Sequence, residues 1–402
     1  MAVLALSHAV LRGSTRGQEA STEVRALWVT RTTLASPAAI AQMVKAAQSG
    51  GFNTLLVQVR GRGDAYYKSA LEPRAGELIA RPEFDPLAET LALAKPAGLK
   101  VHAWVNVNLV SSAVDLPSSR QHIIYRQPDW LMVPRELASE MLNVDPRSPA
   151  YVGRLARWAR ARSNEVEGLF ASPIHPWAAT HIAAVITDIV TRYAVDGVHL
   201  DYLRFPNEEF DYSRAALQQF KVAVRPTLSA DEKRRADTQD AIDPLAYPTL
   251  YRDRWLSFRQ SRLTTLVMRI RTAVKAARPS AVLSAAVVPD LEQATLTRFQ
   301  DWRTWLDQSL IDVLCPMAYT QNVDLFEKQI AAAQDYAGDR PVWAGVGAYR
   351  LTPAATLQHI AAARRQRAAG VILFSYEALV TAPNSAASLT ALGRAAFGSG
   401  LD

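Results

Sequence analysis

Eight short apolar runs, each followed by a longer amphipathic stretch, constrain the fold of this chain more than any other feature. The runs are rich in β-branched residues, as strands are, and the stretches between them have helical spacing. Regular alternation of strand and helix is typical of a parallel sheet with crossover helices, and eight such units close into a barrel. The sequence therefore predicts an α/β fold, a (β/α)8 TIM barrel. The predicted strands are 25–31, 53–60, 100–107, 197–203, 281–289, 312–319, 341–348 and 371–377, and the predicted helices are about 37–49, 85–97, 177–194, 251–277, 300–310, 323–336, 354–368 and 384–396.

The lengths of the connections indicate which end of the barrel carries function. Helix-to-strand connections are short, as at 50–52. Strand-to-helix connections after strands two, three and four are long, roughly 25 to 70 residues, far above ordinary loop lengths. Barrel enzymes build their clefts from these loops. We therefore expect one barrel over 23–397, in which 108–176 and 206–250 are cleft-building loops with short helices.

Residues 1–22 precede the first predicted strand, and we expect them to lie outside the barrel. An apolar start followed by a Ser-, Thr- and Gly-rich tail resembles the later part of a secretory signal without its basic start. A periplasmic or secreted location is therefore favoured over a cytoplasmic one. No segment is long and apolar enough to span a membrane. The net charge of +7 comes without a block of like charges, so the composition does not favour nucleic-acid binding.

The segment DGVHLDYLRFP (196–206) contains the strongest candidate for chemistry. Side chains alternate along a strand, so Val198 and Leu200 suit packing against the outer helices. His199 and Asp201 then face the barrel axis, with Asp201 at the open rim. A charge in such a place is expensive unless it functions or is paired.

Other predicted strand ends are polar too. Carboxylates mixed with Trp and Tyr fit a carbohydrate site, because aromatic rings cover the apolar faces of sugars and a pair of carboxylates cleaves a glycosidic bond. The polar and aromatic residues at or just beyond these strand ends are Gln58, Arg60, Asp64, Tyr67, Trp104, Asn106, Asp290, Tyr319 and Glu377.

Several of these segments resemble a known family. The stretches RALWVT, NTLLVQVRGRGDAYYKSALEP, KVHAWVNV, DGVHLDYLRFP, LCPMAYT, WAGVGAY and VILFSYEAL are similar to those of the glycosyl-hydrolase-like family 10 proteins, which are distinct from the family 10 xylanases. The resemblance extends from about residue 24 to 397. It implies a TIM barrel and hydrolysis of a bacterial or environmental polysaccharide, a class that includes the glycan strands of peptidoglycan.

We expect Asp201 to be the principal catalytic carboxylate, as nucleophile or as base. The general acid is expected among Asp290 and Glu377, with Asp64 third. We expect Arg60 or Arg204 to form an ion pair with Asp201 that keeps it ionised; enclosure by apolar groups or other carboxylates would instead make Asp201 the acid. The residues expected to bind substrate are Gln58, Arg60, Asp64, Tyr67, Trp104, Asn106, His199, Tyr202, Arg204 and Tyr319.

Two other classes of protein compete with this hypothesis. One is a catalytically silent glycan-binding barrel, which needs aromatic platforms but no close pair of carboxylates. The other is a metal-dependent hydrolase that uses His199 and Asp201 and therefore needs a third ligand nearby. No histidine, cysteine or Asp-Asp pattern supplies that ligand, so the sequence predicts neither a metal nor a cofactor.

Overall fold

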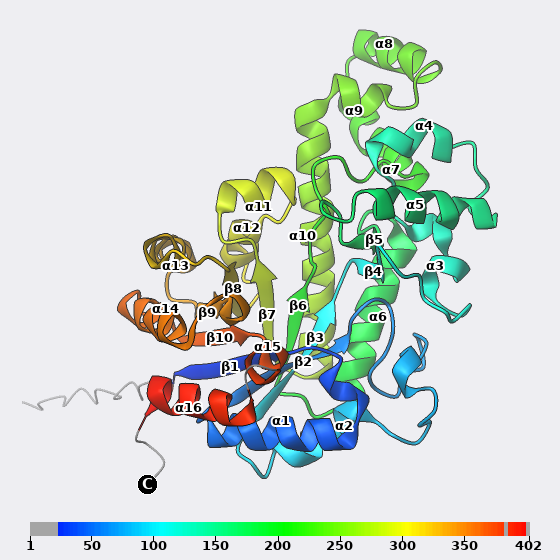
Figure 1. Cartoon of the computed structure of the whole chain (residues 1–402). Helices are drawn as coiled ribbons and strands as arrows, with labels where there is room; N and C mark the ends of the chain where they lie inside the picture. Colours follow the sequence, from blue (N-terminus) through cyan, green and yellow to red (C-terminus); the bar gives the residue numbers. More distant parts are fainter. Residues whose placement is uncertain (1–22, 382–384, 399–402) are drawn as a thin grey trace, which may run out of the picture.

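The computed structural model describes residues 23–381 and 385–398, and these form a closed barrel of eight parallel strands surrounded by helices (Figure 1). The order around the barrel is β1-β2-β3-β6-β7-β8-β9-β10, with β10 pairing back onto β1. The predicted (β/α)8 fold is confirmed, whereas the leader expected at 1–22 lies outside the described residues. The barrel strands are β1 (Val24–Val29), β2 (Thr54–Arg60), β3 (Lys100–Asn106), β6 (Gly197–Asp201), β7 (Val282–Val287), β8 (Val313–Ala318), β9 (Trp343–Val346) and β10 (Gly370–Phe374).

The helices between these strands lie where the amphipathic stretches predicted them. Ser36 caps the first, because its hydroxyl accepts a hydrogen bond from the Ala39 backbone N–H. The eight predicted helices correspond to α1 (Pro37–Ser49), α2 (Pro86–Ala94), α6 (Pro176–Arg192), α10 (Arg252–Ala277), α12 (Trp302–Asp307), α13 (Val323–Ala337), α14 (Pro353–Arg365) and α16 (Ala386–Phe397). Two short helices, α11 (Leu291–Thr297) and α15 (Tyr376–Val380), follow the ends of β7 and β10.

Side chains on the barrel strands alternate between two environments. Val198 and Leu200 belong to the large core between strands and helices, as the alternation predicted. The barrel interior has a separate core that contains three tryptophan rings. Its buried members are Ala26, Trp28, Leu56, Trp104, Val313, Cys315, Trp343 and Ile372.

The connection between β3 and α6 is more elaborate than the loops with short helices that we expected. It contains an antiparallel pair, β4 (Leu109–Ser112) and β5 (Gly168–Phe170), and the helices α3 (Ile123–Arg126), α4 (Ala138–Met141) and α5 (Pro149–Ala161). We call residues 107–175 the insert. It has its own cluster of buried apolar side chains, formed by Val110, Ala113, Ile123, Ile124, Leu131, Val133, Met141, Tyr151, Val152, Leu155, Ala159 and Leu169.

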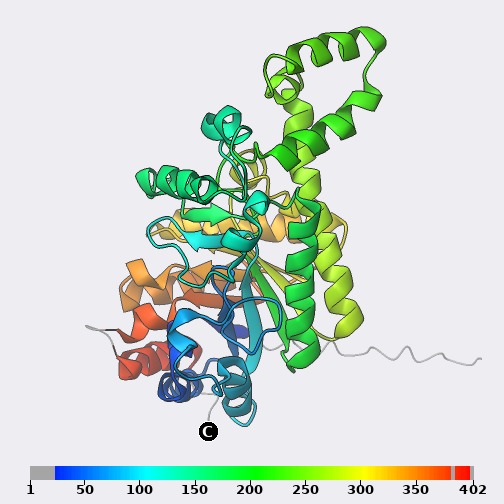
Figure 2. The same cartoon turned by 90° about the vertical axis from the view of Figure 1, so that its right-hand side faces the viewer.

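The connection between β6 and α10 is helical. It forms α7 (Arg214–Val224), α8 (Ala230–Asp240) and α9 (Ala246–Leu250), and α8 and α9 project away from the barrel beside the upper part of α10 (Figure 2). The insert and these helices lie at the same end of the barrel, toward which β6 and β7 point in Figure 1. The carboxyl-terminal end of the barrel is therefore the elaborated one, as the loop lengths predicted.

Candidate active site

Asp201 is the last residue of β6 and is 8 % exposed. The Trp104 indole Nε1–H donates to Asp201 Oδ2 over 3.2 Å, and the Tyr202 backbone N–H donates to Oδ1 over 2.6 Å. Asp201 pairs in register with Asn106 at the end of β3. The carboxylate is therefore held at the carboxyl-terminal end of the barrel by donors from two neighbouring strand ends.

The ion pair that we expected at Asp201 does not form. Among residues 23–381 and 385–398, no cationic nitrogen lies within 4.0 Å of its carboxylate, because Arg60 pairs with Glu72 and Arg204 with Glu167. Burial raises the pKa of the Asp201 carboxyl, and the Tyr202 N–H and the charge of Arg204 offset this only in part. These surroundings therefore favour the protonated form of Asp201 more than an ion pair with an arginine would.

A chain of side-chain hydrogen bonds extends from Asp201 across two strands. Trp104 Nε1–H also donates to Asn106 Oδ1 over 3.0 Å, and Gln58 Nε2–H donates to the same oxygen over 3.4 Å. Gln58 Oε1 in turn accepts from the Arg31 guanidinium over 3.2 Å. The structure therefore brings three predicted site residues, Gln58, Trp104 and Asn106, together with Asp201.

Aromatic rings form a wall beside this chain. Tyr319 stacks on Phe374 with ring centres 5.5 Å apart, and Trp28 meets both rings edge to face. Burial raises the pKa of the Tyr319 hydroxyl well above its usual range, and the charge of Asp201 adds to the effect. Tyr349, which is 51 % exposed, extends the wall into solvent.

Tyr202 and Arg204 continue the rim on the other side of Asp201. The Arg204 guanidinium lies over the Tyr202 ring, 4.7 Å from its centre. Burial and the charge of Asp201 together raise the pKa of the Tyr202 hydroxyl to about 12. Both predicted residues therefore lie next to the candidate catalytic group.

His199 lies inside the barrel and does not contact Asp201. Its Nε2 accepts from Trp28 Nε1–H over 3.0 Å, so Nδ1 carries the proton and donates to Ser284 Oγ over 2.9 Å. Burial lowers the pKa of the ring to about 3, and both nitrogens are occupied. Within the part of the chain that the structure describes, no three His, Cys, Asp or Glu side chains gather as metal ligands would. The hypothesis of a metal centre at His199 and Asp201 therefore finds no third ligand.

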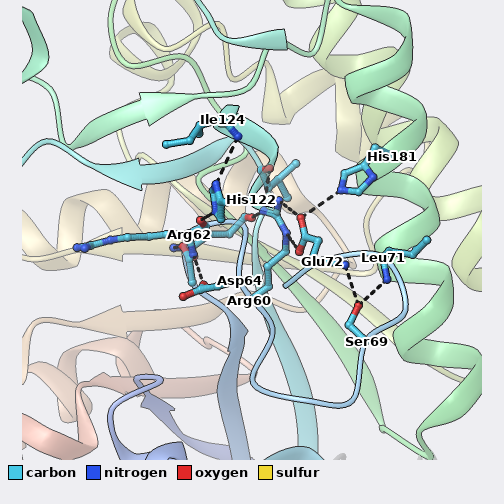
Figure 3. A network of polar contacts seen from close by, with 12 residues as sticks. Arg60, Arg62, Asp64, Ser69, Leu71, Glu72, His122, Ile124 and His181 are labelled. Carbon is cyan, nitrogen blue, oxygen red and sulfur yellow. Dashed lines mark hydrogen bonds and ion pairs between the residues drawn. The ribbon is translucent and has the colours of Figure 1, made fainter. Parts of the chain in front are cut away.

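Two residues that we expected to bind substrate are buried structural residues. Arg60 is 1 % exposed, and its guanidinium forms a bidentate pair with Glu72, which also accepts from His181 (Figure 3). Burial alone would raise the pKa of Glu72, but Arg60 and His181 outweigh it and hold the pKa at about 2. Tyr67 is fully buried and packs edge to face on Tyr193. Neither side chain has surface to offer a substrate.

The three expected acids occupy different surroundings. Asp290 is an exposed helix cap whose Oδ1 accepts from the Gln293 N–H, so it has a structural role at the start of α11. Glu377 Oε1 accepts from the Thr30 N–H and from the Thr33 hydroxyl, which ties the end of β10 to the loop after β1. Asp64 accepts from the Arg62 N–H within the loop after β2. Of the ion pairs and hydrogen bonds between described residues, none links any of the three to Asp201.

Glu167 is a carboxylate that the sequence reasoning missed. It lies just before β5 in the insert and binds Arg204 Nη2 at 2.6 Å, and its buried Oε2 has no hydrogen-bond partner in the part of the chain that the structure describes. Its charge is among those that raise the pKa of Asp201. The only sequence signal was its place in the long connection after β3, which does not predict where a side chain points.

The fold and these residues define a barrel with polar and aromatic side chains at the carboxyl ends of its strands, where barrel enzymes such as glycoside hydrolases carry their active sites. Comparison with known families gives the same class. The sequence profile of the family described as "Glycosyl hydrolase-like 10" matches residues 23–359, so the chain belongs to this family.

Individual relatives agree with this assignment. "Glycosyl hydrolase YngK" of Bacillus subtilis (strain 168) is 24% identical over 293 residues, which cover 68% of this chain and 47% of that protein. "Glycosyl hydrolase DigH" of Escherichia coli (strain K12) is 25% identical over 277 residues, which cover 67% of this chain and 55% of that protein. The chain thus spans about half the length of these curated relatives.

A solved structure supports the fold. The PgaB (BpsB) glycoside hydrolase domain from Bordetella bronchiseptica has a TM-score of 0.63 and 15% sequence identity, covering 92% of this chain and 99% of that one. At this identity the likeness supports the barrel architecture and no more. No helix in 23–381 or 385–398 has the length and apolar character needed to cross a bilayer.

Proposed function

We propose that this protein is a glycoside hydrolase that cleaves a bacterial or environmental polysaccharide, with peptide-free peptidoglycan glycan strands as the first substrate to test. The observation that carries the proposal is the position of Asp201. It is a carboxylate at the end of a barrel strand that accepts a hydrogen bond from Trp104 and that, among the described residues, forms no ion pair. A substrate that lies over the Tyr319 and Phe374 rings would have an aromatic surface for its sugar rings and the Asp201 carboxyl as proton donor to its glycosidic bond.

We assign Asp201 the role of general acid, in place of the nucleophile or base that we first expected. A proton donor must hold its proton at the working pH, which requires a raised pKa. Burial of Asp201 raises its pKa, whereas the arginine pairing that would have kept it ionised is used elsewhere, on Glu72 and Glu167.

We propose Glu167 as the second carboxylate. Arg204 Nη2 neutralises part of its charge, and the side chain as a whole is 38 % exposed although Oε2 itself is buried, so the carboxylate has to turn its Oε2 outward to attack the sugar or to take a proton from water. The separation of the two carboxyls decides the outcome: about 5 Å gives retention and about 6.5–9.5 Å gives inversion. Asp290, Glu377 and Asp64 remain candidates and rank below Glu167, whose charge acts on Asp201; Glu377 shares with Glu167 a buried Oε2 that has no partner among the described residues.

Leaving-group dependence tests the two roles. A substrate with a good leaving group, such as a 2,4-dinitrophenyl chitobioside, needs no protonation, so Asp201→Asn should lose about a thousandfold in kcat/KM on the natural polymer and much less on the aryl substrate. Glu167→Gln should lose activity on both. Equal losses of Asp201→Asn on both substrates would contradict the acid assignment, and full activity of Glu167→Gln would remove Glu167 from the mechanism.

The catalytically silent glycan-binding barrel remains the alternative. The release of reducing ends distinguishes this alternative from a hydrolase, because a binding-only barrel would bind the glycan strands without releasing new reducing ends. The Asp201→Asn variant would then bind and behave like the wild type in every assay.

A further inference from the structure

The loop after β2 forms one wall of a cavity of about 190 Å³ that the proposed mechanism does not use. Arg31 and Arg62 line this cavity together with the insert segment that contains Asp115 and His122. The GRGD sequence at 61–64 supplies two of its lining residues, Arg62 and Asp64.

The Arg62 backbone is fixed from two sides. The Arg62 N–H donates to Asp64 Oδ1 over 2.9 Å, and the Arg62 carbonyl accepts from His122 Nε2–H over 2.7 Å (Figure 3). The His122 Nδ1 accepts from the Ile124 N–H, which places the ring proton on Nε2. Gly63 has φ of +75°, and a Cβ there would lie 2.8 Å from the His122 ring, so glycine is required for this close approach.

The Arg31 side chain is positioned as firmly. It lies across Gly61, where an added Cβ would approach its Cδ to 2.6 Å. Its Nη1–H donates to Gln58 Oε1 over 3.2 Å, and Gln58 is bonded to Asn106 in the chain that ends at Asp201. Both glycines of the loop thus make room for groups that position the two arginines.

Neither guanidinium is paired with a carboxylate. Among the described residues, no ion pair within 4.0 Å involves Arg31 or Arg62, and no hydrogen bond engages the Arg62 guanidinium, whose side chain extends away from the Arg60–Glu72 pair in Figure 3. Arg31 and Arg62 line the same cavity, burial lowers the pKa of Arg62, and the charge of Arg31 lowers it further. Two half-buried like charges on one cavity are costly unless an anion joins them.

Two carboxylates share the same surroundings. The charges of Asp64 and Asp115 raise the pKa of Arg62 in part, although neither carboxylate forms an ion pair with it among the described residues. Asp115 is exposed. A third, Glu77, accepts from the Tyr66 hydroxyl over 2.9 Å. These groups limit the positive potential of the cavity, but among the described residues none of them pairs with either guanidinium; Arg31 uses Nη1 on Gln58 and keeps its other donors, and Arg62 keeps its whole fork for a carboxylate.

We infer that Arg31 and Arg62 form a subsite for a carboxylate carried by a sugar of the substrate. Two observations link this subsite to the cleavage site. Arg31 is connected to Asp201 through hydrogen bonds of Gln58, Asn106 and Trp104. The charge of Arg62 also lowers the pKa of the Tyr202 hydroxyl, next to Asp201 in the chain, and so offsets part of the rise caused by burial. The inference rests on the proposed function, and it narrows the substrate to acidic glycans.

Two tetrasaccharides test this: chitotetraose, which is neutral, and the peptide-free tetrasaccharide in which N-acetylmuramic acid replaces alternate sugars and adds a lactyl carboxylate. Binding is measured by calorimetry at low salt in the Asp201→Asn background. We expect the acidic tetrasaccharide to bind about tenfold more tightly than the neutral one. Arg62→Gln should abolish this preference while leaving the affinity for chitotetraose unchanged. Arg269→Gln, which removes an exposed arginine on α10, is the matched control and should change neither affinity.

Equal affinities for the two tetrasaccharides, or an Arg62→Gln loss that is the same for both, would overturn the subsite. Absence of binding of either would overturn it too. Cleavage by the wild-type protein is scored separately, by the release of reducing ends. If the protein cleaves glycans but Arg62 does not affect the preference for the acidic tetrasaccharide, the proposed hydrolase activity is retained and the subsite is wrong. If Arg62 gives selective binding of the acidic tetrasaccharide but no glycan is cleaved, the subsite is retained and the proposed hydrolase activity is wrong.

Discussion

At the scale of single residues, Asp201 is explained by two physical facts. Strand alternation points it into the barrel, and this could be predicted from Val198 and Leu200 alone. Its lack of an ion pair could not, because the carboxylates that capture Arg60 and Arg204 come from the loop after β2 and from the insert. Irregular connections carry no periodicity from which the direction of a side chain can be read.

The raised pKa of Asp201 has a consequence for stability. A carboxyl whose pKa is higher in the folded than in the unfolded chain stabilises folding below its unfolded value of 3.8, and this contribution is lost as pH rises through the folded pKa. Asp201→Asn does not titrate. We therefore expect the melting temperature of the variant, relative to wild type, to increase as pH rises from about 4 to 7. Thermal unfolding at several pH values measures this, and a difference that decreases with pH would contradict it.

At the scale of elements, the eight barrel strands and their helices were predictable because strand and helix alternate regularly along the chain. β4 and β5 were not, since they lie outside that alternation and pair antiparallel inside a connection; length alone does not explain it, because β9 is as short as β4. The loop after β2 is likewise irregular, and the Arg60–Glu72–His181 contacts attach it to β2 and α6.

Glu72→Gln should therefore loosen this loop. Removing one partner of a buried pair leaves the other charge uncompensated, at a cost of about 3–5 kcal/mol. Because the pKa of Glu72 is depressed to about 2, the contribution is present above its usual 4.5 and is lost as pH falls toward 2. Chemical denaturation at pH 7 and in acid measures both effects.

Asp231→Asn is the control for that substitution. It removes an ion pair with Arg234 in which both side chains are well exposed, so its effect should stay below about 1 kcal/mol. Similar losses for Glu72→Gln and Asp231→Asn would show that the buried pair does not secure the loop.

At the scale of the whole molecule, the barrel carries its additions on one end. The insert has its own apolar cluster, and it supplies Glu167, so its packing positions one of the two proposed carboxylates. The lengths of the connections predicted that the insert would lie after β3. They did not predict that its apolar side chains would form a separate cluster, since no repeated strand–helix pattern marks the insert.

Leu155→Ala tests this dependence. Leu155 is 2 % exposed in the insert cluster, and truncating a buried leucine costs about 2–5 kcal/mol. We expect faster amide hydrogen exchange within 107–175, unchanged exchange in β8 and β9, and a lower kcat. Uniformly faster exchange across the barrel would show that the insert does not unfold separately.

Glycan cleavage that depends on Asp201 as a catalytic carboxylate is the property to test first. The most direct measurement is the rate at which wild type, Asp201→Asn and Asp290→Asn release reducing ends from peptide-free peptidoglycan strands, with folding of each checked by its melting temperature. We predict turnover by wild type and by Asp290→Asn, and a loss on the order of a thousandfold for folded Asp201→Asn. Wild-type turnover by Asp201→Asn would contradict the account.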